Sequence, residues 1–222
     1  MSIRKKILAI SIGPVLVLGV ITLLFILTMV KSSLMDEVQD ALKGTAAATL
    51  AAYDQNTGDY LESTNGDIWK GSYNISKSES LVDRIKENTG MDVTFFYGNK
   101  RIMTSALDKK GNRILGSEAG ERVVNQVIKG KKPFFSTNVS LDGTRNYGYF
   151  IPVYQNGTTD QVIGMVFVGT NKAQKDAIVN KILGSIMMAL LVVMFLCIVT
   201  AMRMAASISK NTVSYTHLRA HE

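Results

Sequence analysis

Residues 92–107 have the sequence DVTFFYGNKRIMTSAL, and this stretch decides the fold class. Two apolar, β-branched or aromatic runs are separated by Gly98-Asn99-Lys100, a combination typical of a turn. We therefore predict a strand at residues 92–97, a turn, and a second strand at residues 101–107. The two strands form a β-hairpin, so the domain contains an antiparallel sheet.

Downstream of the hairpin, turn residues separate further segments. A polar loop at residues 108–112 is followed by a helical pattern over residues 118–129, which Gly130 and Pro133 end. Glycine- and asparagine-containing turns then bound three strands, which we expect at residues 134–141, 146–154 and 161–170. Together with the hairpin they make a five-stranded antiparallel sheet.

Upstream of the hairpin the pattern is helical. In residues 31–53, small or apolar side chains recur at alternating steps of four and three, the spacing of a helix that packs on another element. In one interpretation this helix packs on its own domain's sheet; in a second, part of it also forms a dimer seam. Residues 54–80 are polar and predict a loop, and a short amphipathic helix at residues 81–86 ends at Thr89-Gly90. The predicted class is α+β, with a long N-terminal helix beside the sheet.

Two uncharged runs flank this domain, 24 residues at 7–30 and 21 residues at 182–202. Each is long enough to cross a hydrocarbon core of about 30 Å. The first run is too long for a cleavable signal peptide and lacks a small-x-small cleavage site, so we expect an uncleaved anchor. Basic residues precede the first run and follow the second, which places both ends in the cytoplasm and residues 31–181 outside the cell membrane.

The charge distribution argues against nucleic-acid binding. The chain has a net charge of +7, but residues 31–181 carry 19 Lys and Arg against 17 Asp and Glu. The remaining excess lies in the short flanks, and no basic stripe interleaved with aromatics occurs. The single cysteine, Cys197, lies inside the second apolar run. A disulfide-stapled domain and a cysteine-based zinc site are therefore excluded.

The hairpin and later segments resemble single Cache domains, the PAS-like extracellular sensor domains of bacterial chemoreceptors and sensor kinases. The resemblance covers about residues 31–175 and is carried by several motifs in the expected order: residues 89–98 and 101–105 in the first hairpin, the G-x-R-x-x-G loop at 111–116, and residues 147–154 and 162–169 in the last two strands. Ser117 stands where the family usually has threonine after that loop. The resemblance implies a PAS-like sheet with a long N-terminal helix.

The resemblance further implies the sensory part of a methyl-accepting chemotaxis protein, which signals as a homodimer to cytoplasmic partners. Residues 1–6 are then cytoplasmic, residues 203–212 are the start of a truncated HAMP-like linker, and residues 213–222 resemble a non-native cloning tail. Asn211 stands where the linker usually has proline. Two alternatives stay open: the sensor part of a histidine kinase or diguanylate cyclase, and a membrane-anchored domain that binds another protein.

Catalytic chemistry finds no support in the residue pattern. Both histidines, His217 and His221, fall in the tail, so no histidine remains for a triad, a general base or a metal site. The glycines are spread as turn residues and form no phosphate-binding loop. We expect no enzyme activity, no metal and no cofactor.

Binding of a small extracellular ligand is the expected function, and an anion such as a carboxylate fits best. Such a ligand needs a cation with a few hydroxyl or amide groups in a mostly apolar pocket. In carboxylate-binding relatives a cation near the position of Arg101 grips the ligand, and Thr104 follows it. Alternation puts Arg145, Tyr147 and Tyr149 on one face. The complete candidate set is Arg101, Thr104, Thr137, Asn138, Arg145, Tyr147 and Tyr149, whereas Arg113 and Lys132 are expected to be loop charges.

Overall fold

The computed structural model describes the backbone of residues 3–219 and the side chains of residues 9–207. Predictions for residues 1–2 and 220–222, at the ends of the proposed cytoplasmic segment and tail, lie outside this range. The chain divides into two compact units, residues 35–177 and the pair of segments 1–34 and 178–222. Each unit is described by itself.

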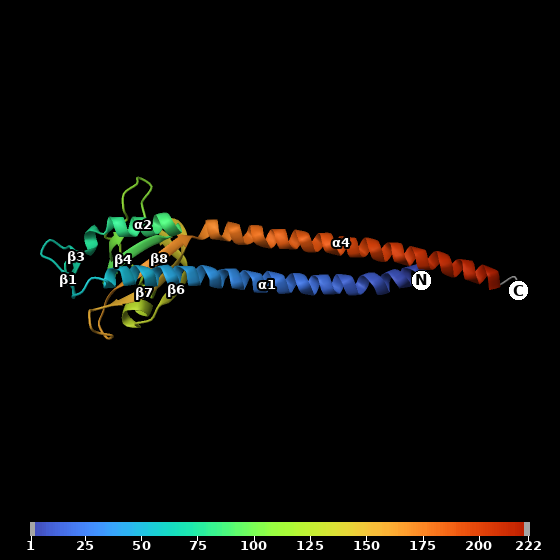
Figure 1. Ribbon diagram of the computed structural model, residues 1–222, viewed down its shortest axis with the longest axis horizontal. Coiled ribbons are helices and arrows are strands. Elements are labelled where there is room, and N and C mark those ends of the chain that lie inside the picture. Colours follow the sequence, from blue (N-terminus) through green and yellow to red (C-terminus); the bar gives the residue numbers. More distant parts are fainter. Residues whose placement is uncertain (1–2, 220–222) are drawn as a thin grey trace. The chain divides into compact units, whose positions relative to one another are not determined.

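The larger unit is built on a five-stranded antiparallel sheet with the strand order β5-β4-β8-β7-β6 (Figure 1). Its strands have the following bounds: β4 Asp92–Tyr97, β5 Lys100–Thr104, β6 Phe134–Leu141, β7 Thr144–Tyr154 and β8 Val162–Asn171. The predicted five-stranded antiparallel sheet is confirmed. Because β8 lies between β4 and β7, the hairpin β4–β5 and the hairpin β6–β7 are joined through the last strand.

The first hairpin ends earlier than its sequence predicts. Strand β5 stops at Thr104 and not at Leu107. Here side-chain hydroxyls take over backbone partners: the Val93 amide donates to Ser105 Oγ at 2.9 Å, and the Ala106 amide donates to Thr104 Oγ1 at 3.1 Å. Serine and threonine compete in this way with regular sheet hydrogen bonding, so the strand ends where they cluster.

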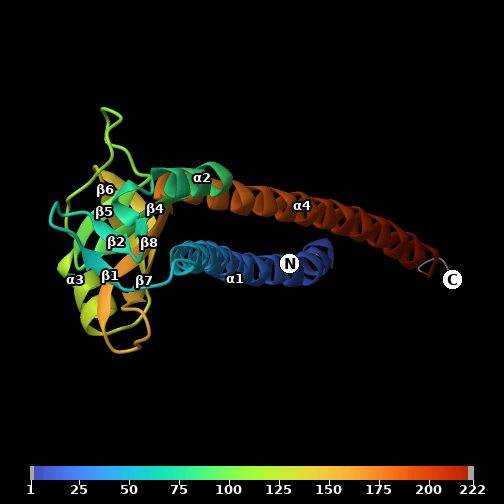
Figure 2. The ribbon, with the colours of Figure 1, turned by 60° about the vertical axis from the view of Figure 1, so that its left-hand side comes forward.

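Residues 54–80 were predicted as a loop, and that prediction is wrong. They form a small antiparallel sheet of β1 Tyr60–Glu62, β2 Ile68–Lys70 and β3 Tyr73–Asn74, followed by the 3₁₀ helix η1 Ile75–Lys77 (Figure 2). A distant residue holds the first strand: Gln155 Oε1 accepts from the Tyr60 amide at 2.9 Å, and Gln155 Nε2 donates to the Tyr60 carbonyl at 3.1 Å.

Residues 35–54 of helix α1 Ile3–Asp54, together with helix α2 Glu79–Thr89, cover one face of the large sheet. Helix α2 ends at Gly90, whose φ of 69° is the left-handed conformation that glycine adopts without strain. In the larger unit, α1 contributes Leu42, Ala46 and Tyr53 to the core on this face. The part of α1 in this unit therefore packs on its own domain's sheet, and the additional dimer seam stays a prediction.

A second core lies on the other face of the sheet, under the short helix α3 Glu121–Val124 and the π-helical turn η2 Asn125–Lys129. The predicted helix at 118–129 thus starts at residue 121. Residues 116–119 are extended instead and follow the edge of β5: the Arg101 amide donates to the Ser117 carbonyl, and the Ala119 amide donates to the Asn99 carbonyl. This segment covers the edge strand of the sheet.

The smaller unit contains the apolar parts of α1 and of α4 Lys172–Arg219. Two helical stretches are long and apolar enough to cross a membrane, Ala9–Asp54 and Lys172–Ser207, with apolar windows of mean hydropathy 2.7 and 2.9. Most of the large apolar side chains in these windows are exposed. An α+β domain flanked in sequence by two such helices is therefore the observed architecture.

Candidate functional site

A pocket of about 500 Å³ lies on the face of the large sheet that carries α3. Phenylalanine side chains of the core on this face, one from each of four strands, line it: Phe96 of β4, Phe134 of β6, Phe150 of β7 and Phe167 of β8. Polar groups enter it from Arg101, from residues 118–122, and from residues 136–140 of β6. The lining of the pocket is about equally polar and apolar. Small-molecule sites likewise combine an apolar wall with placed polar groups, although they are usually more apolar than this one.

Arg101 is the buried charge of this pocket. It lies on β5 opposite Phe96 in the register, is only 7% exposed, and its guanidinium carbon stands 5.3 Å from the centre of the Phe96 ring. Its amide donates to the Ser117 carbonyl and its carbonyl accepts from the Gly116 amide, both at 2.9 Å, so the segment beside β5 fixes its backbone.

The guanidinium of Arg101 is poorly paired. Nη1 donates a long 3.4 Å hydrogen bond to the Ile114 carbonyl, and the buried Nε has no hydrogen-bond partner. Among the residues whose side chains the structure describes, no carboxylate lies within 4.0 Å of it. Burial lowers the pKa of Arg101, and the more distant charge of Asp92 only partly opposes this. A buried guanidinium with so few acceptors destabilises the fold, and an anion that supplies the missing acceptors would bind to it well.

A second arginine and an acid lie at the rim. Arg122 places its guanidinium 5.5 Å from the centre of the Phe134 ring, and Glu118 lines the same pocket. Both side chains belong to exposed residues. Two arginines against one glutamate leave the lining with a positive balance.

The polar side of the pocket comes from an irregularity in β6. The pairing of β6 with β7 shifts register between Ser136 and Val139, so Thr137 and Asn138 have no partner in the ladder. A β-bulge of this kind redirects side chains and is frequent near binding sites. Thr137 and Asn138 of this bulge line the pocket together with Arg101.

The structure thus brings together three of the residues proposed from the sequence, namely Arg101, Thr137 and Asn138. Thr104 is fully buried beside this region, where its hydroxyl shares a 2.7 Å hydrogen bond with Thr94 and also bonds the Val93 carbonyl at 3.1 Å. These contacts satisfy the hydroxyl within the fold, and Thr104 does not line the pocket.

The other three predicted residues lie elsewhere. Tyr147 and Tyr149 belong to the core on the opposite face, which packs against α1, and Arg145 is exposed on that side of β7. The Tyr147 hydroxyl donates to Asp176 Oδ1 at 2.5 Å. The three do share a face, as alternation predicts, but the sheet separates that face from the Arg101 pocket.

Sequence reasoning missed several pocket residues. The phenylalanines were assigned to strands only, since an alternating pattern does not distinguish a pocket wall from a core. Glu118 and Arg122 were placed in a helix without a role. Arg113 is a loop charge, as expected, and in addition forms a two-point ion pair with Asp83.

Comparison with known proteins shows a match to one family model. Residues 73–182 match the family model described as single cache domain 3. Comparison with curated proteins gives no match. Among solved structures, the chain is similar to an extracellular ligand binding receptor from Desulfohalobium retbaense DSM5692, with 15% identity and a TM-score of 0.47, over 68% of this chain and 26% of that one. The chain therefore spans about a quarter of that receptor's length.

The resemblance seen in the sequence is thus confirmed for the segment that follows β2. This segment contains every residue of the pocket lining. Residues 73–182, just under half of the chain, are therefore similar to single Cache domains, the family of the matched model.

Proposed function

We propose that this chain is the input part of a transmembrane chemoreceptor, which binds a small anionic ligand in the Arg101 pocket and signals across the membrane for chemotaxis. The observation that carries the ligand class is the buried guanidinium with an unpaired Nε. A carboxylate or similar anion would supply acceptors to it, while the phenylalanine rings would pack against the body of the ligand.

The membrane arrangement of the proposal follows from charge. Basic residues at 4–6 and at 203 border the two apolar helical stretches, which favours cytoplasmic ends and an outer sensor domain. The proposal includes a homodimer, cytoplasmic signalling partners and a HAMP-type linker after the second span, and no enzyme activity in this chain. A histidine kinase or diguanylate cyclase output would use the same input module.

The test is a ligand screen on the whole chain in detergent micelles. The chain has one tryptophan, Trp69 in β2, so its fluorescence reports unfolding of the sensor domain. Amino acids, small carboxylates, purines and amines form the panel. A ligand at about 100 times its Kd adds about 2.7 kcal/mol to the free energy of unfolding. For a chain of this size, that raises Tm by about 5–10 °C.

Calorimetric titration of a hit then compares three proteins: the parent, Arg101→Ala and Arg145→Ala. Arg145 is the matched control because it is an exposed arginine of the same sheet outside the pocket lining. We expect Arg101→Ala to weaken an anionic ligand by about 10- to 100-fold, the value of a charge-assisted hydrogen bond, and Arg145→Ala to leave binding unchanged. Unchanged affinity in Arg101→Ala, or hits confined to cationic compounds, would overturn the anion proposal.

A further inference from the structure

Strand β6 touches two functional elements at once. Its residues 134–140 line the Arg101 pocket, and the same strand contacts the first turn of α4. The bulge at Thr137 and Asn138 makes the second contact available, because it leaves the Thr137 carbonyl outside the β6–β7 ladder. Lys172, the first residue of α4, donates from Nζ to this carbonyl at 3.1 Å.

Tyr147 of β7 provides a second connection to the same helix turn. Its hydroxyl donates to Asp176 Oδ1 at 2.5 Å, and Lys172 Nζ lies 4.9 Å from the centre of its ring. The ring also stacks on Phe135 of β6, with centroids 6.3 Å apart and an interplanar angle of 10°. Burial raises the pKa of Tyr147 to about 12, and the bond to Asp176 acts in the same direction, so the hydroxyl keeps its proton at neutral pH.

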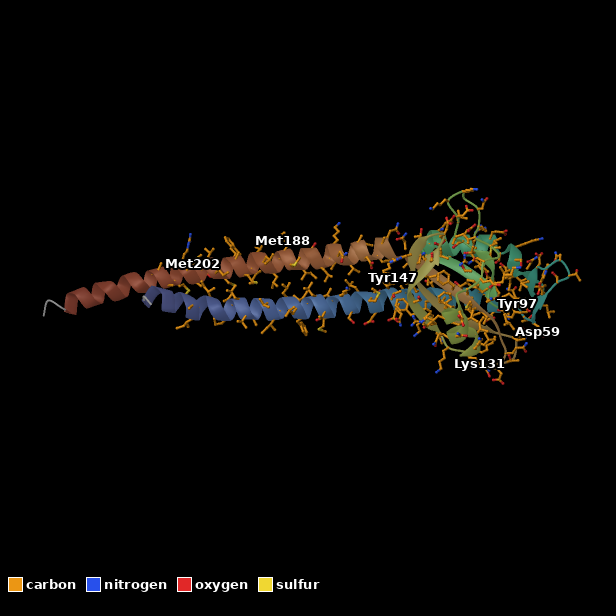
Figure 3. The ribbon with its side chains drawn as sticks, turned by 180° about the vertical axis from the view of Figure 1, so that it is seen from behind. Asp59, Tyr97, Lys131, Tyr147, Met188 and Met202 are labelled. Atoms are coloured by element: carbon orange, nitrogen blue, oxygen red, sulfur yellow. The ribbon has the colours of Figure 1, made fainter. Side chains whose placement is uncertain are left out.

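Both partners on α4 lie on one side of its first turn. Lys172 and Asp176 are four residues apart and therefore neighbours on one helix face. The helix follows β8 without a loop, and the Asn171 side chain accepts from the Gln174 amide at 3.1 Å, which begins the helix in a defined place. Figure 3 labels Tyr147 at the end of the domain where α4 starts.

From these contacts we infer that Thr137, Tyr147, Lys172 and Asp176 form a transmission contact, which couples the state of the pocket to the first turn of α4. The inference rests on the proposed function for the ligand itself. A ligand that hydrogen-bonds the side chains of Thr137 or Asn138 changes the geometry of the bulge, and the Thr137 carbonyl moves with it. Lys172 then loses or tightens its bond, and Tyr147 shifts against Asp176.

The contact has the physical properties that a switch needs. Its hydrogen bond from Lys172 is exposed and hence individually weak, and it joins an irregular strand segment to a helix start. Two arrangements of such a contact differ by little free energy, so a ligand with unequal affinity for them shifts the population. By linkage, the conformation of α4 must in turn change the affinity of the pocket.

The experiment fills the pocket without requiring the natural ligand. In the whole chain in lipid nanodiscs, Cys197 is replaced by alanine, and Asn138→Cys provides a thiol in the pocket wall. A sulfonate-bearing methanethiosulfonate reagent then attaches an anion there through a disulfide bond. Amide hydrogen exchange of residues 172–180 is measured with and without the label.

We expect the label to change the exchange rate of these amides by about threefold or more, since they belong to a locally opening helix end. When Tyr147→Phe or Lys172→Met is combined with Asn138→Cys, the exchange rates of labelled and unlabelled protein should agree within about 1.5-fold. Tyr147→Phe keeps the ring and its stacking on Phe135 and removes only the hydroxyl. The same reagent on Gln161→Cys, an exposed position outside the pocket, should have no effect.

The ratio of the exchange rates of labelled and unlabelled protein shows whether the contact transmits the state of the pocket to α4 or only holds α4 in place. If the contact only holds α4 in place, both variants raise exchange in labelled and unlabelled protein alike and leave the ratio intact, which overturns the inference. An unchanged rate on labelling in the Asn138→Cys parent overturns it as well. Failure of every compound in the ligand screen would count against the proposed function and leave this ratio untouched, since no free ligand is used.

Discussion

Arg113 and Asp83 form a two-point ion pair, with Nη1 2.9 Å from Oδ1 and Nη2 2.5 Å from Oδ2. Arg113 also donates to the Thr104 carbonyl at 2.7 Å. One side chain of the 105–118 loop is thereby tied both to α2 and to the end of β5. The hydrogen bonds of the pair lower the pKa of Asp83 and raise that of Arg113, and the mutual attraction of the charges adds to both shifts.

We predict that Arg113→Ala lowers the free energy of unfolding of the sensor domain by about 1–2 kcal/mol, the value of charged hydrogen bonds reduced for partial exposure. Arg113→Lys should recover only part of this, because an ammonium does not match both carboxylate oxygens. Urea unfolding followed by Trp69 fluorescence measures the change. Arg84→Ala, an exposed arginine of the same helix as Asp83, is the control.

The ion pair between Arg113 and Asp83 should also make the stability of the domain depend on pH in acid solution. Since the pKa of Asp83 is lowered in the folded state, its stabilising contribution is present above the unfolded value of about 3.9 and is lost as the pH falls through the folded value. The difference in stability between the parent and Asp83→Asn should therefore shrink below about pH 4. A difference that persists at pH 2 would assign the effect to packing.

Alkaline solution should destabilise the domain through buried tyrosines. Burial is the main cause that raises the pKa of Tyr53, Tyr60 and Tyr147, in the last case to about 12. Below about pH 10 these hydroxyls are protonated in both states, whereas above it only the unfolded chain releases the protons. Stability then falls by up to about 1.4 kcal/mol per pH unit for each such tyrosine.

Unfolding curves between pH 9 and 12 test this, with Tyr147→Phe as the comparison. The variant should show a shallower decline, because one proton fewer is released on unfolding. Parallel curves for the parent and the variant would contradict the assignment to Tyr147.

Two glycine substitutions should act in opposite directions. A Cβ at Gly164 of β8 would collide with the carbonyl oxygen of Phe96 and lie 3.2 Å from the Tyr97 Cα, and neither backbone atom can yield. We expect Gly164→Ala to cost about 1–3 kcal/mol by overpacking. Gly44, inside α1, has nothing within 4 Å of such a Cβ, so Gly44→Ala should stabilise the domain by about 0.5–1 kcal/mol through helix propensity. Thermal unfolding of both variants measures the signs.

A substitution of Arg101 should affect thermal stability and anion binding differently. Its guanidinium is buried with Nε unpaired, so the fold gains little from the charge. Arg101→Met keeps an apolar stem and removes the desolvated cation, and we expect an unchanged or higher Tm together with lost binding of anions. A loss above about 2 kcal/mol would show that Arg101 is needed for the fold itself.

Local patterns in the sequence predicted much of the fold. Strands β4 and β6 have the bounds expected from apolar runs and turn residues, and the end of α2 at Gly90 follows from glycine's access to left-handed backbone angles. Strands β1 to β3 were missed because two or three residues are too few for alternation to appear, and because their main anchor, Gln155, lies 95 residues from Tyr60.

By itself, the sequence determined the α+β class, the succession along the chain of the five strands of the large sheet, the two apolar helical stretches and the position of Arg101 in the first hairpin, since each depends on neighbouring residues. Only the tertiary structure decided which face of the sheet holds the pocket. Alternation shows that Tyr147 and Tyr149 share a face, yet whether that face is also the face of Arg101 depends on the register between β4, β8 and β7. Long-range pairing sets this register, and a shift by one residue would exchange the two faces.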